Sequence, residues 1–146
     1  MDIFIANDHV GVELKKSVVK FLKGRGIKVT DFGTDTADPV DYPDLAIKVA
    51  KEISKDPKSH LGILICATGV GMCMAANRVK GVLAGTVALP AMAERVKSDD
   101  NINVLCLGAA YLSEDSAIEI VDNWLNTPFS AEERHIRRLK KITDLD

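Results

Sequence analysis

The chain has 146 residues, of which 47% are apolar and 27% charged, and its formal net charge is −2. A chain of this length can build one domain with a full buried core, and its composition excludes the disordered and membrane classes. Because positive and negative charges nearly cancel, no broad cationic surface is available, and we expect no binding to nucleic acid or to a membrane.

The amino-terminal segment and the cysteines indicate where the protein works. Residues 1–8 contain no basic region, and their apolar run is too short for a signal peptide. The three cysteines, Cys66, Cys73 and Cys106, form no Cys-x-x-Cys pair. An odd number of cysteines in apolar surroundings suits a reducing compartment. We therefore expect a cytoplasmic protein.

Five short runs rich in Ile, Val and Leu predict β-strands, at residues 2–6, 27–32, 61–66, 82–87 and 103–107. Amphipathic segments separate these runs, which is the pattern of βαβ units around a parallel sheet. The third and fifth runs are almost continuously apolar, as strands covered on both faces are. The sequence therefore predicts an α/β fold: a single Rossmann-like three-layer domain over residues 1–146 with a five-stranded parallel sheet.

The predicted helices lie between these strands, at residues 11–23, from Asp41 onward, and at 90–98, 113–125 and about 130–142. Asp41 can cap the second of them, whose first turn contains Pro43. Ser130 and Glu133 have the spacing of a capping box at the start of the last one. The loop Gly33–Asp41 is long enough to suggest a functional role.

One strand end has an unusual continuation. Ligands of parallel sheets bind beyond the carboxyl ends of the strands. The third predicted strand ends at Cys66, and a loop with Gly69 and Gly71 follows before a helical stretch at 72–77. Backbone N–H groups of such a loop converge on negative charge and lower the pKa of a nearby thiol. Cys66 is thus either a proton-transfer base or a small apolar residue at a strand end, and its position favours neither.

Cofactor sites are not supported by the remaining motifs. The two glycines lack the third small residue and the acidic partner of a dinucleotide-binding motif. His9, His60 and His135 are scattered without the spacing of metal ligands. Cys73 and Cys106 lack the setting of Cys66, and we interpret both as packing residues. We expect no nicotinamide, flavin or metal.

A cluster of basic residues lies near the carboxyl terminus. Arg134 and Arg138 are four residues apart on one face of the last predicted helix, with His135 beside them. This arrangement suits a phosphate group. A solvated basic helix end explains the same pattern, and from the residues alone this second interpretation is favoured by about two to one.

Short motifs along the whole chain carry a family resemblance. They are Asp8-His9, Gly33-Thr34, Asp41-Tyr42-Pro43, Ile65-Cys66-Ala67-Thr68-Gly69-Val70-Gly71, Ala75-Ala76-Asn77, Asn103-Val104-Leu105 and Arg134-His135-Ile136-Arg137-Arg138. With these motifs the chain resembles the type B ribose 5-phosphate isomerases, a family that includes the galactose 6-phosphate isomerase subunits. The loop after Cys66 and the Arg-His-x-x-Arg motif are its most specific marks.

The resemblance implies an aldose–ketose isomerase that works through an enediolate without metal or organic cofactor. It implies homodimers or homotetramers with sites shared between subunits and a last helix that contacts a neighbouring subunit. Cys66 would move a proton between C1 and C2 of a sugar phosphate, assisted by Thr68. The residues implied in substrate binding are Ala67, Gly69, Val70, Gly71 and Asn77 at the enediolate, Asp8 and Tyr42 at sugar hydroxyls, and His9, Arg134, His135 and Arg138 around the phosphate.

Several positions depart from the family pattern, among them Ala67 in place of the first glycine of the loop and residues 88–91 in place of a more polar stretch. The usual histidine-asparagine pair falls on Asp99 and Asp100, so the histidine thought to open the sugar ring is missing, and the usual phosphate-binding arginine falls on Ala110. Asp99 is the candidate replacement for the ring opener, and Asp100 takes the place of a substrate contact. A four-carbon sugar phosphorylated on its terminal hydroxyl cannot close a furanose ring and needs no ring opener.

The expected reaction is therefore ribose 5-phosphate to ribulose 5-phosphate, a step of the pentose phosphate pathway. The alternatives are another sugar phosphate, namely a tetrose 4-phosphate, galactose 6-phosphate or allose 6-phosphate, or a non-catalytic subunit that only binds sugar phosphate. Intact Cys66, Thr68 and Asn77 argue against the non-catalytic subunit.

Overall fold

The computed structural model describes residues 2–146, and over these residues it contains one five-stranded sheet. The strands are β1 (Asp2–Asn7), β2 (Lys28–Asp31), β3 (His60–Cys66), β4 (Ala84–Thr86) and β5 (Val104–Gly108). Their order is β2-β1-β3-β5-β4, and each neighbouring pair is parallel. The predicted α/β class with a five-stranded parallel sheet is confirmed.

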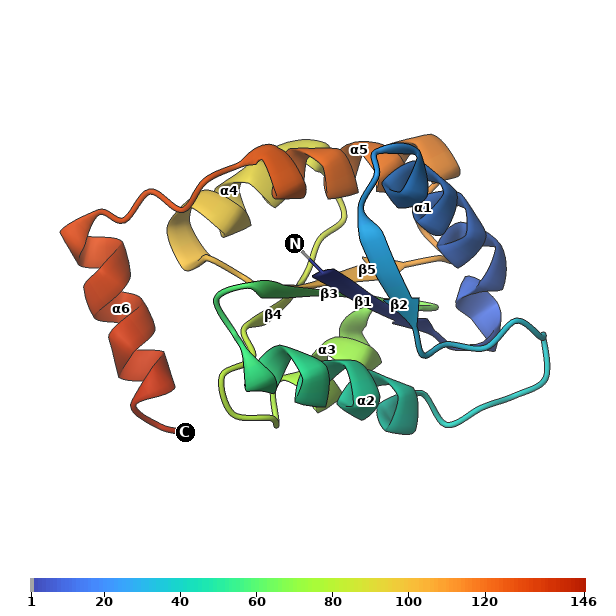
Figure 1. Cartoon of the computed structure of the whole chain (residues 1–146), viewed down its shortest axis with the longest axis horizontal. Coiled ribbons are helices and arrows are strands. Elements are labelled where there is room, and N and C mark those ends of the chain that lie inside the picture. Colours follow the sequence, from blue (N-terminus) through green and yellow to red (C-terminus); the bar gives the residue numbers. More distant parts are fainter. Residues whose placement is uncertain (1) are drawn as a thin grey trace.

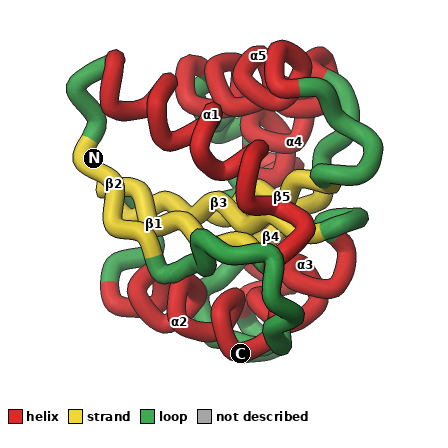
Figure 2. The backbone as a smooth tube through the Cα atoms, turned by 90° about the vertical axis from the view of Figure 1, so that its right-hand side faces the viewer, coloured by secondary structure: helices red, strands yellow, loops and turns green. Residues whose placement is uncertain are grey.

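Helices cover both faces of the sheet. They are η1 (His9–Gly11, a 3-10 turn), α1 (Val12–Gly24), α2 (Tyr42–Lys55), α3 (Val70–Ala76), α4 (Pro90–Asp100), α5 (Glu114–Asn126) and α6 (Glu133–Thr143). Figure 2 shows α1, α4 and α5 on one side of the strands and α2 and α3 on the other, which gives the predicted three layers. In Figure 1, α6 stands beside the layers rather than within one.

Side-chain alternation along β3 explains its continuous apolar run. Ile63 and Ile65 pack in the core beneath α1 and α5, whereas Leu64 and Cys66 pack in the core beneath α2 and α3. Successive side chains of a strand point to opposite faces, so a strand covered on both sides has no position for a polar residue. The same alternation aims the Cys66 thiol toward the layer that contains α3.

The predicted cap Asp41 has the expected position but does not form the expected side-chain hydrogen bond. Asp41 is the N-cap residue of α2, but its side chain accepts no capping hydrogen bond within residues 2–146. Pro43 has no N–H to donate, and the N–H of Asp44 bonds to the main-chain oxygen of Asp41 at 3.2 Å. The capping box at Ser130 is also wrong, since α6 begins at Glu133 with Glu132 as its N-cap. The Ser130 hydroxyl is instead paired with His135 Nδ1 at 2.6 Å.

The parallel sheet has two ends that carry different polar residues. We call the edge where strands end the carboxyl edge and the other the amino edge. Cys66 ends β3 at the carboxyl edge, whereas Asp99 and Asp100 end α4 just before β5 begins at the amino edge. Gly62 pairs with Val104, so four residues of β3, or about 13 Å, separate Cys66 from the start of β5. In Figure 1, α6 lies at the amino edge, on the opposite side of the sheet from the loop between β2 and α2.

Among the helices that the structure describes, none has the length and apolar character needed to cross a membrane.

Candidate active site

The loop after β3 wraps around the Cys66 thiol. Cys66 is 5% exposed, and its Sγ accepts a hydrogen bond from the N–H of Gly69 at 3.2 Å. Gly69 has φ +77, a left-handed conformation that side chains disfavour. A Cβ at Gly69 would also lie 3.0 Å from the carbonyl carbon of Leu107 on the neighbouring strand. Glycine is therefore required for the turn that brings an N–H donor onto the sulfur.

Gly71 is required for a different reason. A Cβ built on Gly71 would lie 2.7 Å from Cζ of the Tyr42 ring. The Tyr42 ring thus rests directly on the backbone of the loop, although it comes from the first residue of α2. This contact joins two segments that are far apart in the sequence, and it makes Tyr42 one wall of the Cys66 site.

A cleft of about 390 Å³ lies over the thiol. Its lining residues are Asp8, Tyr42, Cys66, Ala67, Thr68, Val70, Gly71 and Met74. Seven of these eight are residues that we singled out from the sequence. Met74 was missed, and it lies on the same helical face as Val70, four residues earlier. Both are exposed apolar residues, at 50% for Val70 and 67% for Met74, and they form an apolar rim.

Asp8 is held by the main chain with one oxygen left over. Its Oδ1 accepts the N–H groups of Val10 at 2.9 Å and Gly11 at 3.1 Å, as the cap of η1. The residue is 6% exposed, and its second oxygen remains available to a ligand in the cleft. His9 follows in η1 and does not line the cleft, but its Nδ1 is buried without a hydrogen-bond partner in the described part of the chain.

The hydroxyl of Thr68 is oriented by the loop. Thr68 Oγ1 accepts the N–H of Val70 at 3.2 Å. A hydroxyl that accepts one bond can still donate its own hydrogen. Thr68 therefore offers a proton donor beside the thiol.

The structure does not bring Asn77 to this cleft. Asn77 ends α3, where its Oδ1 accepts the N–H of Ala84 at 2.8 Å and its Nδ2 donates to the carbonyl of Ala84 at 2.9 Å. Its amide thus binds the backbone of the edge strand β4. No local pattern in the sequence indicates this pairing, because it depends on how β4 is placed next to α3.

Asp99 and His135, two further residues predicted for the site, lie together at the amino edge. Asp99 binds Arg95, with 2.8 Å between its Oδ2 and the arginine Nε, and its Oδ1 is 3.9 Å from His135 Nε2. His135 is 4% exposed and is packed against other residues of the same chain. Burial alone raises the pKa of Asp99, but the hydrogen bond from Ser98 and the charges of Arg95 and His135 outweigh it, so this pKa is lowered.

The two arginines singled out on α6 are at the surface. Arg134 Nε binds Glu132 at 2.9 Å, whereas Arg138 forms no ion pair within residues 2–146. Asp100 lines a separate cavity of about 460 Å³ between β4, α4 and α6. None of these three residues lines the Cys66 cleft of the same chain. Along the sheet, the length of β3 separates these residues at the amino edge from the Cys66 cleft at the carboxyl edge.

Cys73, which we interpreted as a packing residue, packs against the core beneath α2 and α3 and also has a shifted pKa. It is half-buried, and its Sγ donates to the carbonyl of Ala84 at 3.4 Å. Contact with the Cys106 thiol lowers the pKa of Cys73 to about 6. The same contact and full burial raise the pKa of Cys106 well above its ordinary value. The structure therefore supports the packing role of both Cys73 and Cys106.

Over residues 2–146 no three His, Cys, Asp or Glu side chains are arranged to hold a metal ion.

Comparisons with known proteins agree with this geometry. Residues 3–142 match the family model described as Ribose/Galactose Isomerase. A probable ribose-5-phosphate isomerase B of Mycoplasma genitalium is 46% identical over 97% of this chain and 93% of its own. A D-erythrulose-4-phosphate isomerase of Pectobacterium atrosepticum is 37% identical over 88% of this chain and 85% of its own.

A solved structure extends the match to three dimensions. The crystal structure of ribose-5-phosphate isomerase B from Mycoplasma genitalium with bound ribulose-5-phosphate has a TM-score of 0.96 and 45% identity, and the match covers 99% of this chain and 95% of that one. The chain therefore belongs to the ribose/galactose isomerase family and is a sugar-phosphate isomerase of the aldose–ketose type.

Proposed function

We propose that this chain interconverts ribose 5-phosphate and ribulose 5-phosphate and that Cys66 moves the proton. The observation that carries the proposal is the Cys66 thiol at the base of a cleft, with the N–H of Gly69 on its sulfur at 3.2 Å. A positioned thiolate within reach of a carbon acid is a general base, and the N–H group stabilises negative charge on the sulfur.

The proposed reaction needs no added reactant. The Cys66 thiolate takes the proton from C2 of the aldose, and the electron pair moves into a C1–C2 double bond as the carbonyl oxygen gains negative charge. The hydroxyl proton then passes from the C2 oxygen to the C1 oxygen, assisted by the Thr68 hydroxyl. Return of the first proton from Cys66 to C1 gives the ketose. The first-turn N–H of Gly71, which has no acceptor inside α3, stabilises the enediolate oxygen.

Two further residues bind the sugar in this proposal. The free carboxylate oxygen of Asp8 accepts a hydrogen bond from one sugar hydroxyl, and the Tyr42 hydroxyl contacts another. Both side chains line the cleft. Each is held in place by main-chain contacts, Asp8 by η1 and Tyr42 by the backbone at Gly71.

We propose that a second copy of the chain completes the site, in a homodimer or homotetramer. The cleft of one copy contains no cationic side chain for a phosphate among its described lining residues. The amino edge supplies such groups, with Arg134 and Arg138 on α6. His9 lies in η1, at the same carboxyl edge of the sheet as the cleft. The exposed apolar rim at Val70 and Met74 is suited to burial against another subunit.

A specific observation supports a second candidate substrate, a tetrose 4-phosphate. Asp99 occupies the position of the ring opener, and its lowered pKa makes it a weaker base than an ordinary aspartate. It is also held by Arg95 and His135. A relative at 37% identity is named as a D-erythrulose-4-phosphate isomerase. A substrate that forms no furanose ring does not need the group that Asp99 replaces.

Turnover of both substrates by the wild type and by Asp99→Ala tests the two candidates. If the tetrose is the substrate, kcat/KM is higher for erythrose 4-phosphate, and Asp99→Ala reduces only the pentose reaction. If Asp99 opens the ring of ribose 5-phosphate, the wild type turns over the pentose efficiently and Asp99→Ala abolishes that activity. Inactivity of the wild type on every sugar phosphate would favour a binding subunit.

A further inference from the structure

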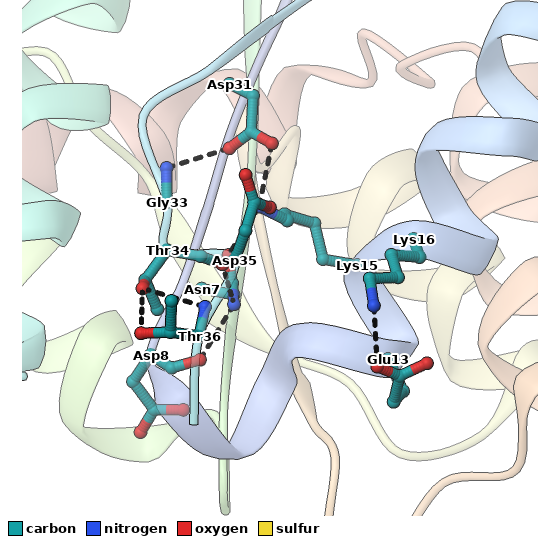
Figure 3. A network of polar contacts seen from close by, with 10 residues as sticks. All are labelled: Asn7, Asp8, Glu13, Lys15, Lys16, Asp31, Gly33, Thr34, Asp35 and Thr36. Atoms are coloured by element: carbon teal, nitrogen blue, oxygen red, sulfur yellow. Dashed lines mark hydrogen bonds and ion pairs between the residues drawn. The ribbon is translucent and has the colours of Figure 1, made fainter. Parts of the chain in front are cut away.

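Lys15 is an ammonium group that the fold buries, with 3% of its side chain exposed. It reaches from α1 to the segment after β2, as Figure 3 shows. Its Nζ is 2.8 Å from Asp31 Oδ2, 3.0 Å from the carbonyl of Thr34 and 2.7 Å from Asp35 Oδ1. An ammonium has three N–H donors, and here each has an acceptor. Lys15 therefore fixes the start of the loop between β2 and α2.

The same loop is bound to the end of β1. Asn7, which is fully buried, donates from Nδ2 to the carbonyl of Thr34 at 3.0 Å and to the carbonyl of Asp8 at 2.7 Å. The Thr34 carbonyl thus accepts from both Lys15 and Asn7, which its two lone pairs allow. A continuous path of hydrogen bonds runs from Lys15 through Thr34 and Asn7 to the backbone of Asp8 (Figure 3).

The other end of this loop reaches the opposite wall of the cleft. The loop leads into Tyr42, the first residue of α2, whose ring rests on Gly71. Asp8 and Tyr42 are therefore the two cleft residues connected to the segment that Lys15 holds. The three hydrogen-bond partners of Lys15 include neither of them.

Loss of the ammonium would loosen the loop without trapping a charge in the core. Its two carboxylate partners are partly exposed, with 37% of the Asp31 side chain and 81% of the Asp35 side chain accessible. Without Lys15 these like charges repel each other and turn toward water. Burial alone lowers the pKa of Lys15, but Asp31 and Asp35 outweigh it and raise this pKa, so the ammonium is charged at neutral pH.

We propose that Lys15 is a positioning residue for the isomerisation: it holds the β2–α2 loop so that Asp8 and Tyr42 meet the substrate at the Cys66 cleft. The inference rests on the proposed function, which places the substrate in that cleft. Lys15 acts through Asp8 and Tyr42 and makes no contact with the reacting atoms.

Lys15→Met, measured beside Lys16→Met, gives the first test. Methionine keeps an unbranched apolar side chain, one heavy atom shorter than that of lysine, and removes the charge and the three donors. We expect kcat/KM for the better sugar-phosphate substrate to fall about 10- to 100-fold in Lys15→Met, because displaced binding groups cost this much. Lys16 is the matched control, since its side chain is 57% exposed and pairs only with Glu13 on the surface. Lys16→Met should have the kcat/KM of the wild type.

A double-mutant cycle with Asp8→Asn separates positioning from general stabilisation. If Lys15 acts through Asp8, the loss caused by Lys15→Met shrinks to about twofold in the Asp8→Asn background. If the losses multiply in this cycle and also in the matching cycle with Tyr42→Phe, Lys15 acts through neither residue, and the proposal is overturned. Should Lys15→Met fail to fold by near-ultraviolet circular dichroism, Asp35→Asn replaces it. That exposed substitution removes one negative charge beside Lys15, and it should raise KM about threefold with only a small loss of Tm at neutral pH.

Failure of this inference is distinguishable from failure of the proposed function. Lys15→Met with wild-type kcat and KM, while Cys66→Ser and Asp8→Asn are impaired, overturns the role of Lys15 alone. Wild-type activity in Asp8→Asn overturns the roles of Asp8 and Lys15, whereas no turnover of any sugar phosphate by the wild type overturns the proposed function as well.

Discussion

The two edges of the sheet hold their polar side chains in different ways. At the Cys66 cleft on the carboxyl edge, backbone N–H groups bind them: those of Val10 and Gly11 bind Asp8, and that of Gly69 binds Cys66. At the amino edge, charged side chains bind one another, as Asp99 does with Arg95. Backbone contacts fix a group in one position, whereas surface ion pairs exchange easily with a ligand. This difference suits the carboxyl edge to bond rearrangement and the amino edge to recognition of charge.

The largest expected effect is the loss of the proposed base, Cys66, at the carboxyl edge. Cys66→Ser should reduce kcat about a thousandfold, because a hydroxyl is too weak an acid to supply the base at neutral pH. Cys73→Ser is the matched control, since Cys73 lies outside the cleft, and it should leave kcat unchanged. Steady-state kinetics of both variants, with circular dichroism to verify the fold, make the measurement. A Cys66→Ser enzyme that keeps most of its kcat would contradict the assignment.

A smaller effect is expected when the carboxyl edge is deformed rather than deprived of its base. The new Cβ of Gly71→Ala would press on the Tyr42 ring, so one of the two must move. We expect kcat/KM to fall about 10- to 100-fold. Gly24→Ala is the control, because a Cβ there would have no neighbour within 4 Å in the described residues other than its own helix backbone and adjacent residues. Equal activity of the two variants would show that the position of Tyr42 does not matter.

Removal of charge at the amino edge should act on binding. Arg138→Ala should raise KM for a phosphorylated substrate about tenfold with little change in kcat, because a charge-assisted phosphate contact is lost. Arg134→Ala should behave in the same way. Arg137→Ala is the control on the same helix, since Arg137 faces Glu133 at 3.8 Å. Unchanged KM in both Arg134→Ala and Arg138→Ala would identify these arginines as a solvated helix end.

The smallest effect is the acid dependence of stability. The hydrogen bond from Lys15 lowers the pKa of Asp35 at the carboxyl edge, and Asp99 at the amino edge also has a lowered pKa. A carboxyl group with a lower pKa in the folded state stabilises above its unfolded pKa, near 3.8, and this stabilisation is lost as the pH falls through the folded value. Tm measured from pH 6 to pH 3 should therefore fall less steeply in Asp35→Asn and Asp99→Asn than in the wild type. Identical slopes would mean that these pairs do not contribute.

The fold could be predicted from the sequence because its signals are local. The run 61–66 has no polar position, and the structure covers both faces of β3. The cleft at the carboxyl edge could also be predicted from the sequence, because Asp8 and Cys66 lie at the ends of adjacent parallel strands and must be close together.

The remaining features depend on contacts between distant segments. Asn77 is engaged by Ala84, Ser130 by His135, and Cys73 by Cys106, and in each pair the partner's place is set by tertiary packing. In the sequence, Lys15 is indistinguishable from the other lysines of an amphipathic helix. Only the position of the loop after β2 shows that its ammonium is buried.

Subunit complementation is the most direct test of the central claim, which is that each chain contributes its carboxyl edge to one active site and its amino edge to another. Cys66→Ser chains, which are expected to be inactive, are unfolded together with Arg138→Ala chains, which are expected to bind phosphate weakly. The mixture is refolded and assayed at a substrate concentration below the KM of the arginine variant. If the carboxyl edge of one copy works with the amino edge of another, half of the mixed dimers' sites contain both intact halves. Random assembly then restores about a quarter of the wild-type activity per chain. Activity that equals the average of the two separate variants would show that the halves do not meet between subunits and would contradict the account.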